Sequence, residues 1–198
     1  MGLFVIYDVL IRLRIRVIMK SLYMQNIIKI VQANSKFLRK IAEKVKISAI
    51  GTAPIKGVLR DMNEVLNNED DGVAIAAPQI SVSLRIFIVS GKMFVKNSQS
   101  ENEAKSTLKS RVFINPIIKK KSKKKVEMEE GCLSVRWKYG KVMRSTKATV
   151  SAYDEDGTKF TYTGSGILAQ IFQHETDHLN GVLFIDTARD VKEVPPQS

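Results

Sequence analysis

Apolar residues recur at helical spacing in three stretches of this chain. The periodicity predicts helices over about residues 35–45, 55–67 and 167–179. Ser35 is a suitable N-cap for the first helix, and Asn180-Gly181 is a natural stop for the last. We expect the apolar stripes of these helices to form core.

Short apolar runs between and after these helices are typical of strands. They predict strands over residues 84–89, 112–118, 142–153 and 160–162. Asn115-Pro116 predicts a bulge or an edge position in the second of them, and residues 154–157 predict a hairpin turn. Residues 91–110 are polar and predict a long surface loop.

Length and composition indicate a single globular domain. The chain has 198 residues, of which 44% are hydrophobic and 26% are charged, so it is long enough to bury a sizeable core. Because no run of about 18 uncharged apolar residues occurs, we expect no transmembrane helix and no membrane partner. We assign residues 24–187 to the domain, 188–198 to a flexible tail and 1–23 to an N-terminal extension.

Basic residues interrupt the apolar extension, which excludes an ordinary secretory signal peptide. Two interpretations remain: an organellar transit peptide, or an upstream start codon with the true start at Met19 or Met24. The first would place the protein in a mitochondrion or plastid, and the second leaves it in the bacterial cytoplasm.

The chain is strongly basic, with a net charge of +12 and a pI near 9.8. Such a balance favours contact with RNA, ribosomes or other anionic surfaces, although a basic proteome accounts for it equally well. Lysines fill residues 119–125 around Ser122, where they form a solvated turn or touch RNA phosphates. Since Cys132 is the only cysteine, no intramolecular disulfide can form, which fits a reducing compartment.

The strongest chemical signal is the only pair of histidines. His174 and His178 lie four residues apart in the third predicted helix, so both imidazoles leave one helical face and can bind one metal ion. Glu175 follows the first histidine, where a carboxylate can act on a metal-bound water. Two unrelated histidines at this spacing would not account for the full His-Glu-x-x-His pattern.

Two other stretches carry candidate chemistry. Cys132 follows Glu129-Glu130-Gly131, a poor setting for a core cysteine, and a thiolate is a strong ligand for iron or zinc. Residues 72–80 are rich in small side chains, which is typical of a close backbone approach, and they lack the phosphate-loop pattern. Gln79 in this stretch either donates a hydrogen bond toward a carbonyl oxygen or faces solvent.

Three motifs in a fixed order resemble those of the peptide deformylases: GVAIAAPQ at 72–79, EGCLS at 130–134 and QHETDH at 173–178. The resemblance extends over about residues 25–187. That family removes the formyl group from the N-terminal methionine of new bacterial and organellar proteins and releases formate. The resemblance implies an α+β fold with small antiparallel or mixed β-sheets packed around a central C-terminal helix that carries His-Glu-x-x-His.

The resemblance also implies a metal site and an acid/base group. Cys132, His174 and His178 would hold one divalent metal, usually Fe²⁺ in the family and often replaceable by Zn²⁺, Ni²⁺ or Co²⁺. Glu175 would act as general base and then as general acid. We therefore expect a metal-dependent hydrolase.

Substrate binding is implied for a further set of residues. Gln79 and the backbone N–H of Leu133 would bind the formyl oxygen. The peptide and its methionine would be bound by Val73, Ala74, Ile75, Glu130, Gly131 and Ile171. The chain departs from the usual family pattern at Ala74, Arg136 and Tyr139, where glycine, proline and arginine are common, and these changes concern substrate preference.

The expected partners are N-formylmethionyl nascent peptides, with a transient ribosome contact, and we expect a monomer. Two alternatives are weighed against a deformylase. A helical metallopeptidase usually takes its third ligand downstream of the histidines, and no third histidine exists. A catalytically idle ribosome- or RNA-binding relative would fit the charge, but it would not need an intact set of ligands with Glu175 and Gln79.

Overall fold

The computed structural model describes residues 28–94 and 109–195. The extension 1–23 and most of the predicted loop 91–110 lie outside these ranges, so the predictions about them stay predictions. Among the residues described, no helix is long and apolar enough to cross a membrane.

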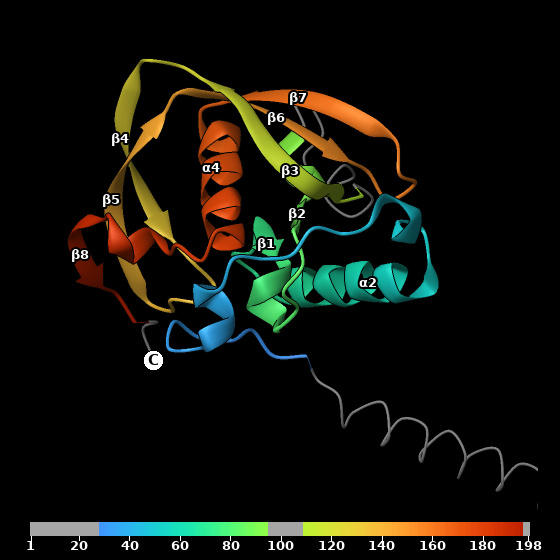
Figure 1. Ribbon diagram of the computed structural model, residues 1–198. Coiled ribbons are helices and arrows are strands. Elements are labelled where there is room, and N and C mark those ends of the chain that lie inside the picture. Colours follow the sequence, from blue (N-terminus) through green and yellow to red (C-terminus); the bar gives the residue numbers. More distant parts are fainter. Residues whose placement is uncertain (1–27, 95–108, 196–198) are drawn as a thin grey trace, which may run out of the picture.

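Helices α2 (Ala53–Asn67) and α4 (Ile167–Leu179) confirm two of the three predicted helices (Figure 1). The strands are β1 (Ala74–Ala76), β2 (Ile86–Val89), β3 (Arg111–Lys121), β4 (Lys125–Gly131), β5 (Lys138–Ser145), β6 (Lys147–Tyr153), β7 (Lys159–Ser165) and β8 (Arg189–Glu193). Short 3-10 helices span Lys36–Arg39, Ile47–Ala49, Ala77–Ile80, Gly91–Phe94 and Phe184–Asp186.

The strands form two antiparallel sheets, one with the order β1-β2-β3-β6-β7 and one with the order β4-β5-β8. Helix α4 lies between the two sheets, with β4 and β5 on one side and the larger sheet on the other (Figure 1). The predicted α+β class, with small sheets around the C-terminal helix, is confirmed.

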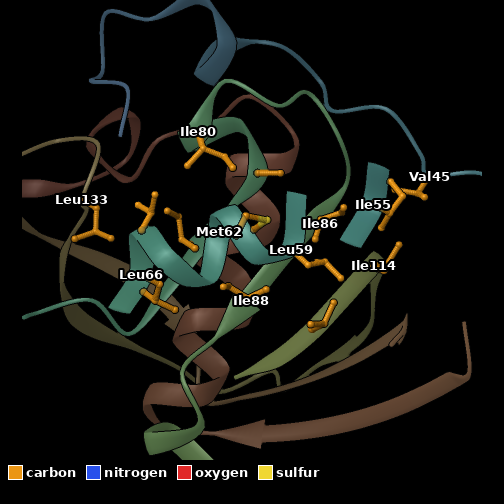
Figure 2. Packing of buried hydrophobic residues seen from close by; sticks show 14 residues of the cluster. Val45, Ile55, Leu59, Met62, Leu66, Ile80, Ile86, Ile88, Ile114 and Leu133 are labelled. Carbon is orange, nitrogen blue, oxygen red and sulfur yellow. The ribbon is translucent and has the colours of Figure 1, made fainter. Parts of the chain in front are cut away.

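Strand β2 is apolar at every position because both faces of the larger sheet are covered. Ile86 and Ile88 point toward α2, whose Leu59, Met62 and Leu66 belong to the same cluster (Figure 2). Phe87 and Val89 point the other way, into the cluster that contains Phe172 of α4. A strand that is buried on both faces loses the usual alternation of polar and apolar residues, and this one fixes α4 against the sheet.

The predicted helix over residues 35–45 is wrong beyond its first turn. Only Lys36–Arg39 is helical, as a 3-10 turn capped by Ser35. The following segment is extended, because its backbone finds partners elsewhere: Ala42 N–H donates to Leu179 O at 3.0 Å and Glu43 N–H donates to Ser83 O at 2.9 Å. Tertiary hydrogen bonds therefore override a local helical pattern.

Asn115 completes this arrangement from the bulge that the sequence predicted. Its φ is 52°, the pairing of β3 with β6 shifts between Ile114 and Ile117, and its side-chain amide exchanges two 2.8 Å hydrogen bonds with the backbone of Val45. The Asn115 side chain thus makes the two backbone hydrogen bonds with the extended segment that a neighbouring strand would otherwise make.

Two further strand predictions change. Residues 142–153, predicted as one strand, form β5 and β6, which break at Thr146 and belong to different sheets. Residues Arg189–Glu193, which the sequence analysis placed in a flexible tail, form β8 on the edge of the smaller sheet.

Candidate metal centre and substrate cleft

Helix α4 delivers the two histidines and the glutamate to one place. His174 and His178 lie one turn apart, with ring centroids 4.9 Å from each other. Glu175 is 4% exposed and His178 is 1% exposed, so the chemistry sits where the helix is enclosed between the sheets. Burial strengthens electrostatic interactions between these groups and any bound ion.

Cys132 joins them from the turn after β4. Its Sγ lies 3.2 Å from His178 Nε2, and the candidate ligand atoms of Cys132, His174 and His178 all lie within 4.8 Å of one another. One sulfur and two imidazole nitrogens at this separation fit a divalent transition metal with a further position open. The three ligands expected from the sequence are therefore brought together.

A buried carboxylate orients His174. Glu130 Oε2 lies 2.9 Å from His174 Nδ1, which leaves Nε2 of that ring to face the metal centre. Carboxylates in this position fix the tautomer and the ring orientation of a metal-binding histidine. Glu130 was expected to line the methionine pocket; it does line the cleft, and the structure gives it this second contact as well.

Arg144 holds that carboxylate in turn. Its Nε and Nη2 donate to the two oxygens of Glu130 at 2.6 and 2.9 Å, and its Nη1 donates to Asp177 at 2.6 Å. Burial alone would raise the pKa of Glu130, but the hydrogen bonds from Arg144 and His174 outweigh burial and hold this pKa at about 2. Glu130 is thus a carboxylate throughout the working pH range.

Glu175 has a carboxylate oxygen, Oε2, that is buried and finds no hydrogen-bond partner among the described residues. The side chain lines the cleft beside Cys132 and His174. Burial raises the pKa of Glu175 to about 7 in the absence of a metal ion. A buried carboxylate oxygen without a protein partner is suited to exchange a proton with a water or substrate in the cleft.

Gln79 presents its amide nitrogen to the same centre. Ala76 N–H donates to Oε1 at 2.8 Å, which orients the amide, and Nε2 then faces Ser134 Oγ at 3.1 Å and Cys132 Sγ at 3.7 Å. Gln79 is 2% exposed, so the solvent-facing alternative is wrong. The backbone N–H of Leu133, the other expected donor, makes no hydrogen bond within the described part of the chain.

A cleft of about 300 Å³ opens beside these groups. Of the six residues expected to bind the peptide, five line it: Val73, Ala74, Glu130, Gly131 and Ile171. The exception is Ile75, which is fully buried in the cluster under α2, because neighbouring residues of β1 point to opposite faces of the sheet.

Sequence reasoning missed the site roles of three residues that the structure reveals. Arg144 holds Glu130, and Gln170 donates to Glu129 O at 2.8 Å along the cleft wall. Trp137 stands at the rim of the cleft beside Arg136, a residue that the sequence had already linked to substrate preference. Arg144 carried a usable signal, since a charged residue at an apolar phase of a strand needs a buried partner.

Comparisons with known proteins agree on one family. The model of the polypeptide deformylase family matches residues 27–194. Peptide deformylase 2 of Clostridium acetobutylicum is 40% identical over 133 residues, which cover 67% of this chain and 77% of that protein. Peptide deformylase 2 of Clostridium perfringens is 33% identical over 166 residues, which cover 84% of this chain and 96% of that protein. The crystal structure of a peptide deformylase from Legionella pneumophila has a TM-score of 0.70 and 36% identity, covering 83% of this chain and 88% of that one.

Proposed function

The chain belongs to the peptide deformylase family and is a hydrolase that removes N-terminal formyl groups, and we propose that Cys132, His174 and His178 hold its metal ion. The observation that carries this proposal is the cluster of one sulfur and two imidazole nitrogens within 4.8 Å. A divalent ion held by these ligands would supply Lewis-acid activation of water and of the formyl carbonyl. We favour Fe²⁺, the metal that the family resemblance implies. Zn²⁺, Ni²⁺ and Co²⁺ are possible substitutes because thiolate and imidazole donors suit all four ions.

The acid/base role falls to Glu175. Its buried Oε2 accepts the proton of the attacking water, and the same oxygen then delivers this proton to the leaving amine nitrogen. The C–N bond of the formamide breaks as the amine is protonated. The products are formate and a peptide with a free N-terminal methionine.

Charge that develops on the formyl oxygen needs hydrogen-bond donors that are already in place. Gln79 Nε2 is held toward Cys132 by the bond from Ala76 to its oxygen, and Leu133 N–H lies in the turn just after Cys132 without another partner in the described residues. Donors fixed before the reaction stabilise such a charge without reorganisation. We propose that these two groups form the oxyanion site.

The peptide itself occupies the cleft. Val73, Ala74 and Gly131 face its backbone, and Ile171 contributes to the methionine pocket. The pocket is closed by β1 on one side and α4 on the other, since both elements contribute lining residues. All proposed groups come from one chain, so the site needs no residue from a second copy. We propose a monomer, and sedimentation velocity at micromolar concentration tests this.

Formate release is the decisive measurement. Protein purified without oxygen and loaded with Fe²⁺ or Ni²⁺ is expected to release formate from formyl-Met-Ala-Ser and to leave acetyl-Met-Ala-Ser intact. Cys132→Ala and His178→Ala are expected to lose metal, as measured by elemental analysis. Full metal occupancy in either variant would remove that residue from the ligand set, and formate release by metal-free protein would overturn the metal assignment.

We also propose that the β3–β4 turn makes the transient ribosome contact. All six lysines between Lys119 and Lys125 are exposed. The turn is rigid, since Ser122 N–H donates to Lys147 O and Thr146 N–H to Lys124 O, at 3.0 and 3.1 Å. Clusters of ammonium groups bind RNA phosphates in a salt-dependent way.

Cosedimentation with bacterial ribosomes tests this contact. Reversing Lys120, Lys121, Lys123 and Lys124 to glutamate is expected to abolish cosedimentation and leave the rate on free peptides unchanged. Reversal of the exposed Lys40, Lys44, Lys46 and Lys56, which changes the net charge equally, is the matched control. Equal binding by both variants would rule out the turn. The alternatives of a metallopeptidase and of an idle RNA-binding relative are not favoured by the comparisons.

A further inference from the structure

The only tryptophan of the chain stands at the rim of the cleft in an unusual backbone conformation. Trp137 has a φ of 65°, in the left-handed region that bulky residues rarely adopt. The residue is 38% exposed and lines the cleft. Strain of this kind persists only where the surroundings impose it, and it gathers at sites that bind ligands.

The surrounding backbone imposes this conformation. Val194 N–H donates to Trp137 O at 2.7 Å, and Lys138 N–H donates to Val135 O at 3.3 Å. The next residue, Lys138, pairs with Glu193 of β8. Because hydrogen bonds hold the chain on both sides of Trp137, the fold fixes the direction in which the indole leaves the backbone.

Arg136 lies over one face of the indole. Its guanidinium carbon lies 5.4 Å from the ring centroid of Trp137, while its Nη atoms pair with Glu69 and, at 3.0 Å, with Asp71. Asp71 lines the cleft from the loop after α2. Arg136 therefore connects the segment after Cys132 to this loop across the rim of the cleft. Two carboxylates neutralise the guanidinium, and the indole face that Arg136 does not cover is the apolar surface that Trp137 offers at this rim.

We propose that Trp137 is a specificity-determining residue that contacts the side chains following formylmethionine, with Arg136 as its positioning residue. The inference rests on the proposed function, since it takes Cys132, His174 and Glu175 to be the reacting end of the cleft. A peptide with its formyl group there must leave the cleft past its rim. An indole face binds aromatic and large apolar side chains better than alanine, so the enzyme prefers such residues after methionine.

Fluorescence of the intact protein tests the contact directly, because Trp137 is the sole tryptophan. Titration with the product peptide Met-Phe-Ser is expected to shift the emission, and Met-Ala-Ser is expected to shift it less. The overturning result is unchanged emission at peptide concentrations that saturate binding in a calorimetric titration.

Substrate selectivity gives the second test. The ratio of kcat/KM for formyl-Met-Phe-Ser over formyl-Met-Ala-Ser is expected to be about fivefold in the unmodified protein and to fall to about one in Trp137→Ala. Trp137→Phe is expected to keep a ratio between these two values, because it retains a smaller aromatic ring. Met143→Ala, which removes an exposed apolar side chain on β5, is the matched control and keeps the full ratio. An unchanged ratio in Trp137→Ala overturns the proposal.

Two further measurements separate this role from a structural one and from the proposed function. Trp137→Gly removes the strain and the indole together, so it is expected to lose selectivity while keeping its melting temperature; a retained ratio would overturn the proposal. Arg136→Ala is expected to lower the emission anisotropy of Trp137, because the indole would lose the contact that positions it, and Arg136→Lys is expected to restore the anisotropy. Unchanged anisotropy in Arg136→Ala would show that Arg136 does not position the indole. If no formylated peptide yields formate, the proposed function fails, while the emission titration still decides whether Trp137 contacts a peptide.

Discussion

Glu130 and His174 meet at 2.9 Å between Oε2 and Nδ1, and this contact ties the metal centre to the smaller sheet. Glu130 lies at the end of β4, opposite Gly140 of β5, and His174 lies on α4. The carboxylate that orients the ring is itself held by Arg144 through two hydrogen bonds. The position of His174, a proposed metal ligand, therefore depends on the packing of α4 against β4 and β5.

Glu130→Gln tests this dependence without opening a cavity. The substitution keeps the shape but removes the charge that raises the basicity of His174, so we expect metal affinity to fall by about tenfold to 100-fold. Competition with a chelator at fixed pH measures the change. Glu129→Gln, at the neighbouring exposed position, is the control, and an equal loss in both variants would contradict the role of Glu130.

Glu175→Gln should separate catalysis from metal binding. The amide cannot accept the proton of the attacking water, so we expect kcat to fall by at least about 100-fold. Metal content, measured by elemental analysis, should stay at the level of the unmodified protein because Glu175 is not among the three clustered ligands. Turnover within a factor of two of the unmodified protein would exclude Glu175 as the acid/base group.

Gln79→Glu removes a donor while keeping the acceptor that Ala76 uses. One carboxylate oxygen can still accept the 2.8 Å bond from Ala76 N–H, but the group that faces Cys132 no longer donates. Loss of one oxyanion donor typically costs about 100-fold to 1,000-fold in kcat. Single-turnover formate release measures this loss, and Gln170→Glu on the cleft wall serves as the comparison. An unchanged kcat in Gln79→Glu would show that groups other than Gln79 stabilise the oxyanion.

The parts of the site that lie within one helix could be predicted from the local sequence. His174, Glu175 and His178 occupy a single helix, and their spacing alone predicts one shared face. The contact of Arg144 with Glu130 and the orientation of Gln79 arise from pairing between separate segments, and no periodicity encodes them. The resemblance, rather than the spacing, supplied Cys132 and Gln79 as partners of the histidines.

The wrong predictions share a physical cause. The segment after Arg39 has helical periodicity, yet its amides bond to Ser83 and Leu179, so long-range partners decide its conformation. Ile75 was assigned to the substrate because the resemblance implies that the backbone of residues 72–75 lines the peptide, and the two-residue period of β1 directs its side chain into the core. Sequence pattern identified the residues concerned, and only the packing decided which face each one takes.

Two glycines should respond to alanine in opposite directions. Gly181 ends α4 with a φ of 77°, and an added Cβ would lie 2.8 Å from the carbonyl oxygen of Arg39, so Gly181→Ala combines backbone strain with a clash against a fixed backbone. We expect it to lower the free energy of unfolding by more than about 1 kcal/mol. Gly57 lies inside α2 and an added Cβ would meet nothing within 4 Å, so Gly57→Ala should raise that free energy by about 0.5–1 kcal/mol.

Urea unfolding of the metal-loaded protein measures both changes. Because Gly181 lies just after the helix that carries His174 and His178, its substitution should also weaken metal binding, whereas Gly57→Ala should leave metal affinity unchanged. Tolerance of Gly181→Ala without loss of stability would show that the junction between α4 and the extended segment after Arg39 is looser than its 2.8 Å approach requires. Destabilisation by Gly57→Ala would contradict the open space beside that position of α2.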